Sequence, residues 1–248
     1  MLPPGDPELA TATWLGYVEH DRPVAGLSDI LDPYYVLHLG SFDQTDRPAG
    51  FAETGNRLAE YLMVLFLWEK LPDDLLRMFW QSAPEACRRH AMWFMGREMA
   101  SGRKFRSRAM AYWEARLRCA IEANDPEPYR RELGTISALF RWDVDRLWLL
   151  EQLKTMLEAG FAPPDAFGLV ESLSAMLPEH VDAIVEVTDA LVRQPKVDGW
   201  IFAAQGASLR QILVAGKKSP SPNTVATVKD IVSYLASRGN TGFLDLDE

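Results

Sequence analysis

The sequence predicts an all-α protein, on three observations. Apolar residues recur at intervals of three and four along most of the chain, which is the period of an amphipathic helix. No stretch alternates apolar and polar residues between the turn signals that usually flank strands. Proline or glycine interrupts the pattern at short intervals, so consecutive helices are joined by short links and pack as antiparallel neighbours. We therefore expect helical hairpins stacked in a HEAT/ARM-like α-solenoid, with an irregular compact helical domain as the alternative.

About twelve helices are expected in order along the chain. They lie within residues 7–19, 25–40, 53–71, 73–82, 84–100, 107–123, 126–141, 143–159, 164–177, 179–194, 199–215 and 222–238. We expect one all-helical domain over 1–248, with a soft boundary near 124–126. The polar segment 41–52, which contains Pro48 and Gly50, is expected to be a mobile loop.

The helix expected at 222–238 has the clearest pattern. In the helix at 222–238, Ser221 is the expected N-cap, Pro222 the first helical residue and Gly239 the stop. Its apolar stripe consists of Val225, Val228, Ile231, Val232 and Leu235. The helix at 143–159 has the same organisation and ends at Gly160, with a stripe formed by Leu149, Leu150, Leu153, Met156 and Leu157. Stripes of this kind indicate the faces that pack against other helices.

The helix at 53–71 differs from the others because residues 61–68, YLMVLFLW, are apolar on every side. A helix with this composition is typically covered all round by its neighbours. We expect it to be the most buried element. The run is also much too short to cross a bilayer.

Charge and composition exclude several classes of protein. The chain has 248 residues, a net charge of −9, two cysteines far apart and eight tryptophans. An acidic surface repels phosphate, which disfavours nucleic acids and anionic membranes as partners. The N-terminus has no basic and apolar signal segment, and Cys87 and Cys119 form no CxxC pair, so we expect a cytoplasmic protein without membrane contact.

No catalytic or cofactor motif is present in the sequence. Gly216-Lys217-Lys218-Ser219 lacks the spacing of a P-loop, and GxGxxG, HExxH, GxSxG and an EF-hand loop are missing. The four histidines, which lie in separate segments without ligand spacing, are His20, His38, His90 and His180. The acidic pairs Asp73-Asp74 and Asp143/Asp145 fall at expected helix starts, where negative charge stabilises the helix. We therefore expect no enzyme activity, no cofactor and no bound metal.

A basic segment stands out against the acidic background. Residues 88–118 carry nine Arg or Lys and two Glu, a local excess of +7. The candidate interaction surface that this segment offers consists of Arg88, Arg89, Arg97, Arg103, Lys104, Arg106 and Arg108.

The helical period assigns parts of the basic segment to the core. Trp113 falls on an apolar stripe with Ala109 and Leu117 and so belongs to the core. Arg116 flanks this stripe and is expected to be half-buried, while Glu114 is spaced to pair with Arg118. Most of the segment is therefore expected to be a solvated or internally paired helix face.

Five segments resemble the C-terminal helical region of large bacterial multidomain proteins, in which an effector domain and a NACHT/STAND-like NTPase, or another nucleotide-dependent module, precede a helical-repeat tail. They are APEACRRHAMWFMGRE (83–98), AYWEARL (111–117), ELGTISALFRWDVDRLWLLEQL (132–153), LPEHVDAIVEVTDALV (177–192) and SRGNTGFLDLDE (237–248). Many such proteins act in anti-phage defence or signalling. The resemblance implies a detached tail, either a fragment or the product of a truncated gene, with a non-catalytic sensor, scaffold or autoinhibitory role.

Two functions follow as expectations. The first is a helical module that binds protein, either its own upstream domains, a second copy of itself or a phage component. The alternative is a helical domain that binds nucleic acid or phosphate through residues 88–118.

Overall fold

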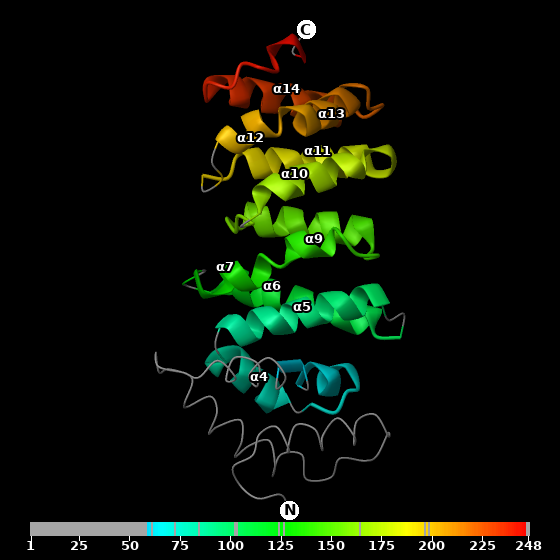
Figure 1. Ribbon diagram of the computed structural model, residues 1–248, viewed down its shortest axis with the longest axis vertical. Helices are drawn as coiled ribbons and strands as arrows, with labels where there is room; N and C mark the ends of the chain where they lie inside the picture. Colours follow the sequence, from blue (N-terminus) through cyan, green and yellow to red (C-terminus); the bar gives the residue numbers. More distant parts are fainter. Residues whose placement is uncertain are drawn as a thin grey trace, which may run out of the picture. The chain divides into compact units, whose positions relative to one another are not determined.

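The computed structural model of the protein describes residues 59–60, 62–71, 73–83, 85–101, 104–123, 125, 127–163, 165–195, 197 and 199–246. Every regular element in these ranges is helical, which confirms the predicted all-α class (Figure 1). The α-helices are α4 (Asp73–Ser82), α5 (Glu85–Ser101), α6 (Arg106–Glu122), α7 (Glu127–Leu133), α8 (Ile136–Leu139), α9 (Arg146–Glu158), α10 (Ala166–Ala175), α11 (Leu177–Val192), α12 (Trp200–Ala204), α13 (Gly206–Lys217) and α14 (Pro222–Ser237). Residues 59–60 and 62–67 are also helical, and a short 3-10 helix, η1 (Leu244–Leu246), follows α14.

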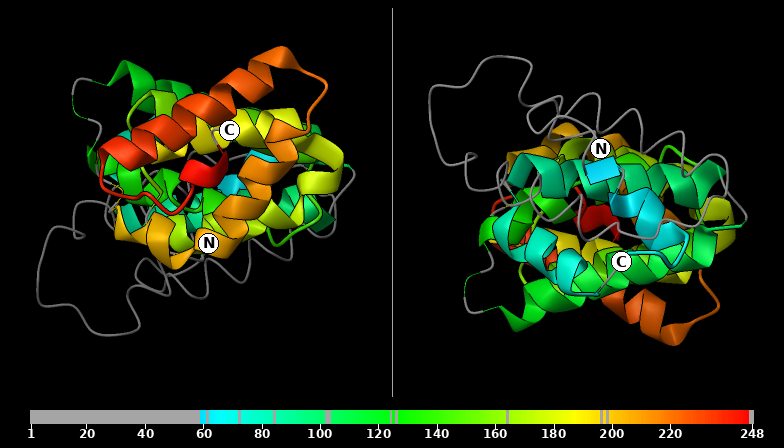
Figure 2. Two further views of the ribbon diagram at one scale, coloured as in Figure 1. Left: turned by 90° about the horizontal axis from the view of Figure 1, so that it is seen from above. Right: turned by 90° about the horizontal axis from the view of Figure 1, so that it is seen from below.

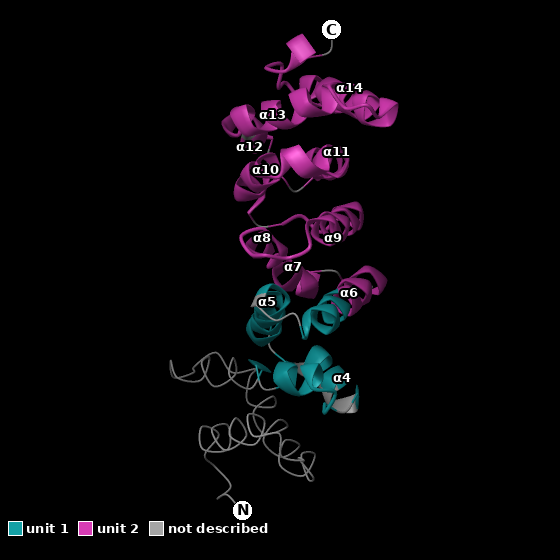
Figure 3. Cartoon of the chain, turned by 90° about the vertical axis from the view of Figure 1, so that its right-hand side faces the viewer, with its two compact units in different colours: residues 1–113 teal, residues 114–248 magenta. Residues whose placement is uncertain are grey.

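The chain divides into two compact units, 1–113 and 114–248 (Figure 3). The division falls inside α6, whose first half belongs to the first unit and whose second half belongs to the second. Each unit has its own buried apolar residues and is described by itself below.

The core of the first unit is built from aromatic rings and methionines. Tyr112 is buried, and its ring makes edge contacts with Phe66 and Trp80 at centroid distances of 5.4 and 5.7 Å. Trp80 Nε1 also donates a hydrogen bond of 3.1 Å to the Tyr112 hydroxyl, so the polar end of the tyrosine has a partner inside the core.

The apolar helix over 59–60 and 62–67 is only partly covered. Leu62 and Met63 are fully buried, but Phe66 and Trp68 are half-buried. The expectation that this helix is enclosed on every side is therefore wrong for the described residues. The helix ends where Glu69 adopts a positive φ of 58°, a backbone conformation that does not continue a right-handed helix.

The second unit is arranged in two layers of helices. In one layer α11 packs against both α9 and α14, and in the other α10 packs against both α8 and α13. Each helix also contacts its sequence neighbour in the opposite layer, as α10 does with α11 and α13 with α14. Figure 3 shows the two layers edge-on.

The end of the described chain returns onto the last two helices. η1 packs against α13 and α14, and Figure 2 shows it seated beside them. Arg210 of α13 holds it in place by donating to Asp245 at 2.7 and 3.0 Å and to the carbonyl of Gly242 at 2.5 Å.

Two predicted helices are each split in the structure. The predicted helix 126–141 is α7 followed by α8, and the break occurs at Gly134-Thr135, where the Thr135 hydroxyl donates to the carbonyl of Glu132. Glycine destabilises a helix interior, and a threonine hydroxyl competes for backbone acceptors. The predicted helix 199–215 is α12 followed by α13, interrupted at Gln205, whose ψ of 22° is not helical. Neither split was predicted, because the apolar period of the sequence continues through the residues at which the helix is interrupted.

The sequence predicts one helix ending at 177 and the next beginning at 179, with Pro178 between them, but in the structure α10 ends at Ala175. Helix α11 already begins at Leu177, with Pro178 in its first turn, where a missing N–H costs nothing. The irregularity lies instead at His180, whose φ and ψ of −142° and 39° interrupt the helical geometry.

The predicted N-cap of α14 is confirmed, and Asp145, which was predicted only to lie at a helix start, is the N-cap of α9. The Ser221 hydroxyl accepts from the Thr224 N–H at 3.3 Å, and the Asp145 carboxylate accepts from the Trp148 N–H at 3.0 Å. Gly160 and Gly239 stop α9 and α14 with positive φ values of 84° and 87°. All five residues of the predicted α9 stripe are buried.

Gly216 allows α13 to approach two other helices closely. A Cβ atom at this position would lie 2.6 Å from a methyl group of Val228 on α14 and 2.7 Å from one of Val185 on α11. Both contacts are far inside normal van der Waals distance, so glycine is required by the packing here.

Several predictions fall outside the described residues. These are the helices at 7–19 and 25–40, the loop at 41–52 and the beginning of the helix at 53–71. Within the described ranges, no helix combines the length and the apolar character that a membrane crossing requires.

Candidate interaction surface

Six of the seven predicted surface residues are described, and all six lie in the first unit. The seventh, Arg103, lies outside the described residues. The six are divided between those that bind the backbone of their own unit and those that face outward.

Arg88 and Arg106 are tied to backbone carbonyls near their own helices. Arg88 Nη1 donates to the carbonyl of Ala83, just before α5. Arg106 Nε donates to the carbonyl of Met99, near the end of α5, at 2.8 Å. Carbonyls at helix ends have no partner within the helix, so Arg106 satisfies one of the acceptors left over at the end of α5.

Arg108 likewise satisfies a backbone carbonyl at the end of the helix over 62–67. Its Nε donates to the carbonyl of Phe66 at 2.5 Å, its Nη1 forms a 2.7 Å ion pair with Glu69, and its guanidinium lies 4.6 Å from the centre of the Phe66 ring. Because Arg108 neutralises the helix C-terminus and covers an aromatic ring, its role is structural.

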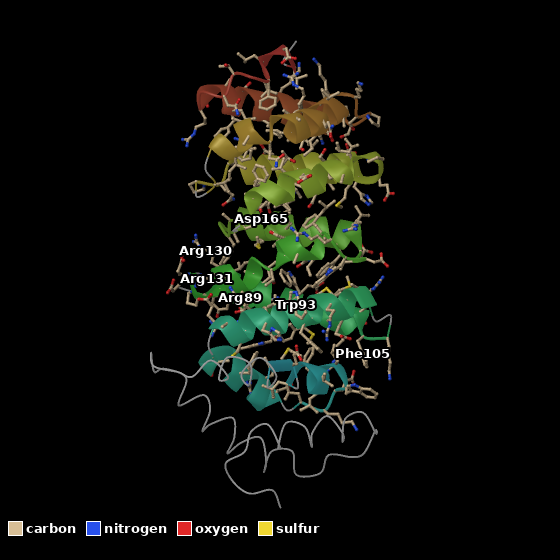
Figure 4. The ribbon with its side chains drawn as sticks, viewed as in Figure 1. Arg89, Trp93, Phe105, Arg130, Arg131 and Asp165 are labelled. Carbon is tan, nitrogen blue, oxygen red and sulfur yellow. The ribbon has the colours of Figure 1, made fainter. Side chains whose placement is uncertain are left out.

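Arg89, Trp93 and Arg97 form a ridge along α5, with one residue per turn. We call these three residues the α5 ridge; Arg89 and Trp93 are labelled in Figure 4. Arg89 is exposed and has no partner in the described part of the chain. The guanidinium of Arg97, whose side chain is about half exposed, lies 5.5 Å from the centre of the Trp93 ring. The ring of His90 stacks on the Trp93 indole at a centroid distance of 5.6 Å. Nε2 of His90 also lies 2.7 Å from Oε1 of Glu60.

A second outward-facing group surrounds Lys104, just before α6. We call Trp68, Lys104 and Phe105 the Lys104 cluster. The ammonium of Lys104 lies 4.1 Å from the centre of the Trp68 ring and 5.2 Å from that of Phe105, and the two rings are 5.5 Å apart. Lys104 is exposed and both rings are half-buried, so the cluster presents a charge on an aromatic base.

The predictions for the middle of α6 have mixed outcomes. Trp113 is fully buried, which confirms its place in the core. Arg116 was expected to be half-buried, and this is wrong: it is 1% exposed and forms a bidentate ion pair with the fully buried Glu132 of α7. Glu114 was expected to pair with Arg118, but its carboxylate instead accepts a hydrogen bond of 2.7 Å from Trp148 Nε1.

The second unit contains a cavity of about 240 Å³ that the sequence did not indicate. It lies where α11 and α14 end and α12 begins, and its lining includes Val192, Gln194, Phe202, Tyr234, Arg238 and Asn240. Two residues of this lining, Gln194 and Asn240, each have a side-chain atom, Oε1 and Nδ2 respectively, that is buried without a hydrogen-bond partner. Unpaired buried polar atoms are rare in native proteins. Because neither atom is accessible to water, neither borders the open space of the cavity.

The acidic pairs and the two cysteines of the sequence are part of the helical framework. Asp73 begins α4 and Asp145 caps α9, as their positions in the sequence predicted. Cys87 is buried and Cys119 is partly buried. In the described residues no group of three or more His, Cys, Asp or Glu side chains is placed to hold a metal ion.

A scan of known protein-family models, a search of curated proteins and a search of solved structures each found no match to this chain.

Proposed function

We propose that the protein is a non-catalytic helical module that binds another protein, and that its helices form a HEAT/ARM-like α-solenoid. The resemblance of its sequence to the helical tails of bacterial multidomain proteins suggests that it serves as the C-terminal sensor or scaffold of a defence or signalling protein. The partner is a protein with an acidic surface.

The layered packing of the second unit is the observation that carries this proposal. α9, α11 and α14 follow one another in one layer while α8, α10 and α13 follow in the other, so the contacts within a layer join helices that are two or three elements apart along the chain. This pattern is typical of solenoids, in which stacked hairpins expose long helix faces for partner binding. No catalytic motif competes with this interpretation.

The basic residues that face outward supply the binding surface. Arg89 and Arg97 of the α5 ridge and Lys104 are exposed, whereas Arg88, Arg106 and Arg108 bind backbone carbonyls. Since the chain carries −9 overall, these outward charges are a local exception that attracts acidic groups.

A charge-reversal experiment tests this surface. The variant Arg89→Glu/Arg97→Glu/Lys104→Glu spares the three arginines that bind carbonyls, and its control, Arg141→Glu/Lys218→Glu/Lys229→Glu, reverses three exposed charges in the second unit. Titration of a labelled glutamate-rich peptide, followed by fluorescence anisotropy, should show binding weakened about tenfold or more in the first variant and little changed in the second. Equal affinity for wild type and both variants would remove the α5 ridge and Lys104 from the proposal.

Nucleic-acid binding is the second candidate, and one observation favours it. The Lys104 cluster combines a cation with two half-buried aromatic rings, as surfaces that stack unpaired bases do. Binding to phosphate must weaken steeply with salt. A gel-shift series with a short single-stranded oligonucleotide that shows no complex at low salt would exclude this function.

A further inference from the structure

The segment that follows α14 is attached to α13 and α14 mainly through side chains. We call residues 241–246 the strap. The turn before it is fixed by the N–H of Asn240, which donates to the carbonyl of Leu235 at 2.9 Å. Beyond that turn, the described strap forms backbone–backbone hydrogen bonds only within itself. One of its carbonyls, that of Gly242, accepts from the side chain of Arg210. The strap is therefore held on α13 and α14 much as a short bound peptide would be.

The 3-10 turn of η1 sorts the side chains of the strap into two faces. Residues three apart lie on the same side of such a turn. Phe243 and Leu246 are accordingly buried, whereas Leu244 between them is 46% exposed. Asp245 pairs with Arg210 at 2.7 Å, and the same guanidinium lies 5.7 Å from the centre of the Phe243 ring. The contacts of the strap thus come chiefly from two apolar side chains and one carboxylate.

The strap covers the side of α13 and α14 that faces away from α10 and α11 (Figures 1 and 3). We call this covered surface the seat. The ion pair over it is open to solvent, since the side chains of Arg210 and Asp245 are 40% and 62% exposed, and exposed pairs contribute little to stability. Gly239, with a φ of 87°, and Gly242 lie on either side of the connecting turn and leave its backbone free to rearrange. The strap can therefore leave the seat without unfolding either helix.

We propose that the seat is a docking site for a segment of the protein partner and that the strap is its built-in competitor. The segment that fits carries an aromatic residue, a carboxylate two positions later and an aliphatic residue at the third position, as Phe243, Asp245 and Leu246 do. Its carboxylate binds both terminal nitrogens of Arg210, as that of Asp245 does. The inference rests on the proposed function, because an acidic partner supplies the carboxylate that Arg210 requires.

The probe is a peptide with the sequence of residues 241–246, TGFLDL, labelled with fluorescein at its N-terminus and amidated at its C-terminus. It is titrated into full-length wild type and into full-length Phe243→Ser/Leu246→Ser, whose strap lacks both buried side chains, and binding is followed by fluorescence anisotropy. The variant should bind about tenfold or more tightly, because the tethered strap of wild type competes at an effective concentration on the order of millimolar. Circular dichroism checks that the variant is folded. No binding to the folded variant overturns the seat as a docking site, and equal affinity for the two proteins overturns the strap as competitor.

A control variant and a second probe define what the seat recognises. Leu244→Ser makes the same kind of change at the exposed position of the strap and should leave the affinity at the wild-type value. A probe with the Asp245→Asn change should bind the Phe243→Ser/Leu246→Ser variant about threefold or more weakly, because a neutral amide cannot form charged bonds to Arg210. Equal affinity of the two probes overturns the assigned role of Arg210.

Hydrogen exchange in the wild type tests the competition without any variant. Unlabelled probe at several millimolar should speed amide exchange in residues 243–246 by displacing the strap, whereas a peptide of the same composition in the order LTDGLF should not. Unchanged exchange with the probe overturns the strap as competitor. These experiments leave the α5 ridge and the Lys104 cluster, which lie in the first unit, untouched. Failure here combined with retained binding of the glutamate-rich peptide would therefore reject the seat while leaving the proposed function intact.

Discussion

Arg116 and Glu132 form a buried, two-pronged ion pair inside the second unit. Arg116 Nε donates to Glu132 Oε1 at 2.6 Å and Nη2 donates to Oε2 at 2.9 Å, and the two side chains are 2% and 0% exposed. The guanidinium also lies 5.1 Å from the centre of the Tyr129 ring. The pair joins the second half of α6 to α7 over a separation of sixteen residues.

Breaking this pair from one side should destabilise the protein strongly. Arg116→Met or Glu132→Leu leaves the other charge buried without its partner, which costs about 3–5 kcal/mol of unfolding free energy. The double variant should cost less than either single change, because no charge is then stranded. Urea denaturation followed by circular dichroism measures all three. As a control, Lys154→Met breaks the exposed pair with Glu186 and should cost less than about 1 kcal/mol. Additive costs in the double variant would contradict the stranded-charge explanation.

Gly216→Ala should lower stability although alanine is the better helix former. The added methyl would lie within 2.7 Å of Val185 and Val228, and overpacking of this kind costs about 1–3 kcal/mol, against about 1 kcal/mol gained from helix propensity. Gly206→Ala, at the start of the same helix and with nothing within 4 Å of the new methyl, is the matched control and should be neutral or stabilising. Thermal melting of both variants measures the difference. A melting temperature of Gly216→Ala above that of wild type would show that the two valines can move aside.

Asp182 should make stability depend on pH. The hydroxyls of Ser219 and Thr224 donate to its Oδ1 at 2.6 and 2.7 Å and hold the pKa of this carboxyl below its usual value. A group whose pKa is lowered by folding contributes stability above its unfolded pKa and loses it as the pH falls through the folded value. Wild type should therefore be more stable than Asp182→Asn at pH 7 and pH 5, and the gap should shrink below about pH 4.

Denaturation midpoints across this pH range test the Asp182 contribution. Asp230→Asn, which removes an exposed carboxylate on α14, should show a small and nearly constant difference from wild type. A gap between wild type and Asp182→Asn that persisted unchanged to pH 3 would mean that the carboxylate charge plays no part.

Arg210→Ala should release the end of the chain from α13. The arginine makes two bonds to Asp245 and one to the carbonyl of Gly242, and it covers the ring of Phe243 at 5.7 Å. Its loss should speed amide hydrogen exchange in residues 243–246 while leaving α9 and α11 protected. Lys229→Ala, at an exposed position on α14, should leave this exchange unchanged. Wild-type protection of residues 243–246 in Arg210→Ala would show that Phe243 and Leu246 alone secure the tail.

The sequence predicted the elements whose ends are set by local chemistry. Ser221 and Gly239 delimit α14 as expected, because caps and left-handed stops depend on the residue at one position. The split at Gly134 and the one at Gln205 were not predicted, since the apolar period continues through both. How the helices pack against one another decides such breaks, and the apolar period of a single segment does not show that packing.

The candidate surface was predicted only as a set of charges. A helical wheel separated Trp113 from the solvent side correctly, but it could not find the partner of Arg116, because Glu132 lies on another helix. Nor could it separate Arg89 from Arg108, because the partner of Arg108 includes a backbone carbonyl, an acceptor that every residue carries. The cavity was not predicted for the same reason. Nothing in the sequence shows that Gln194 and Asn240 each have a buried polar atom without a partner, because that depends on residues from other helices.

Gln194 connects the end of α9 to the end of α11. Its Nε2 donates to the carbonyl of Leu157 in the last turn of α9 and to that of Ala190 in the last turn of α11. Since one amide nitrogen donates to a carbonyl at each of two helix ends, loss of this side chain would remove a hydrogen bond from both last turns at once and loosen them together.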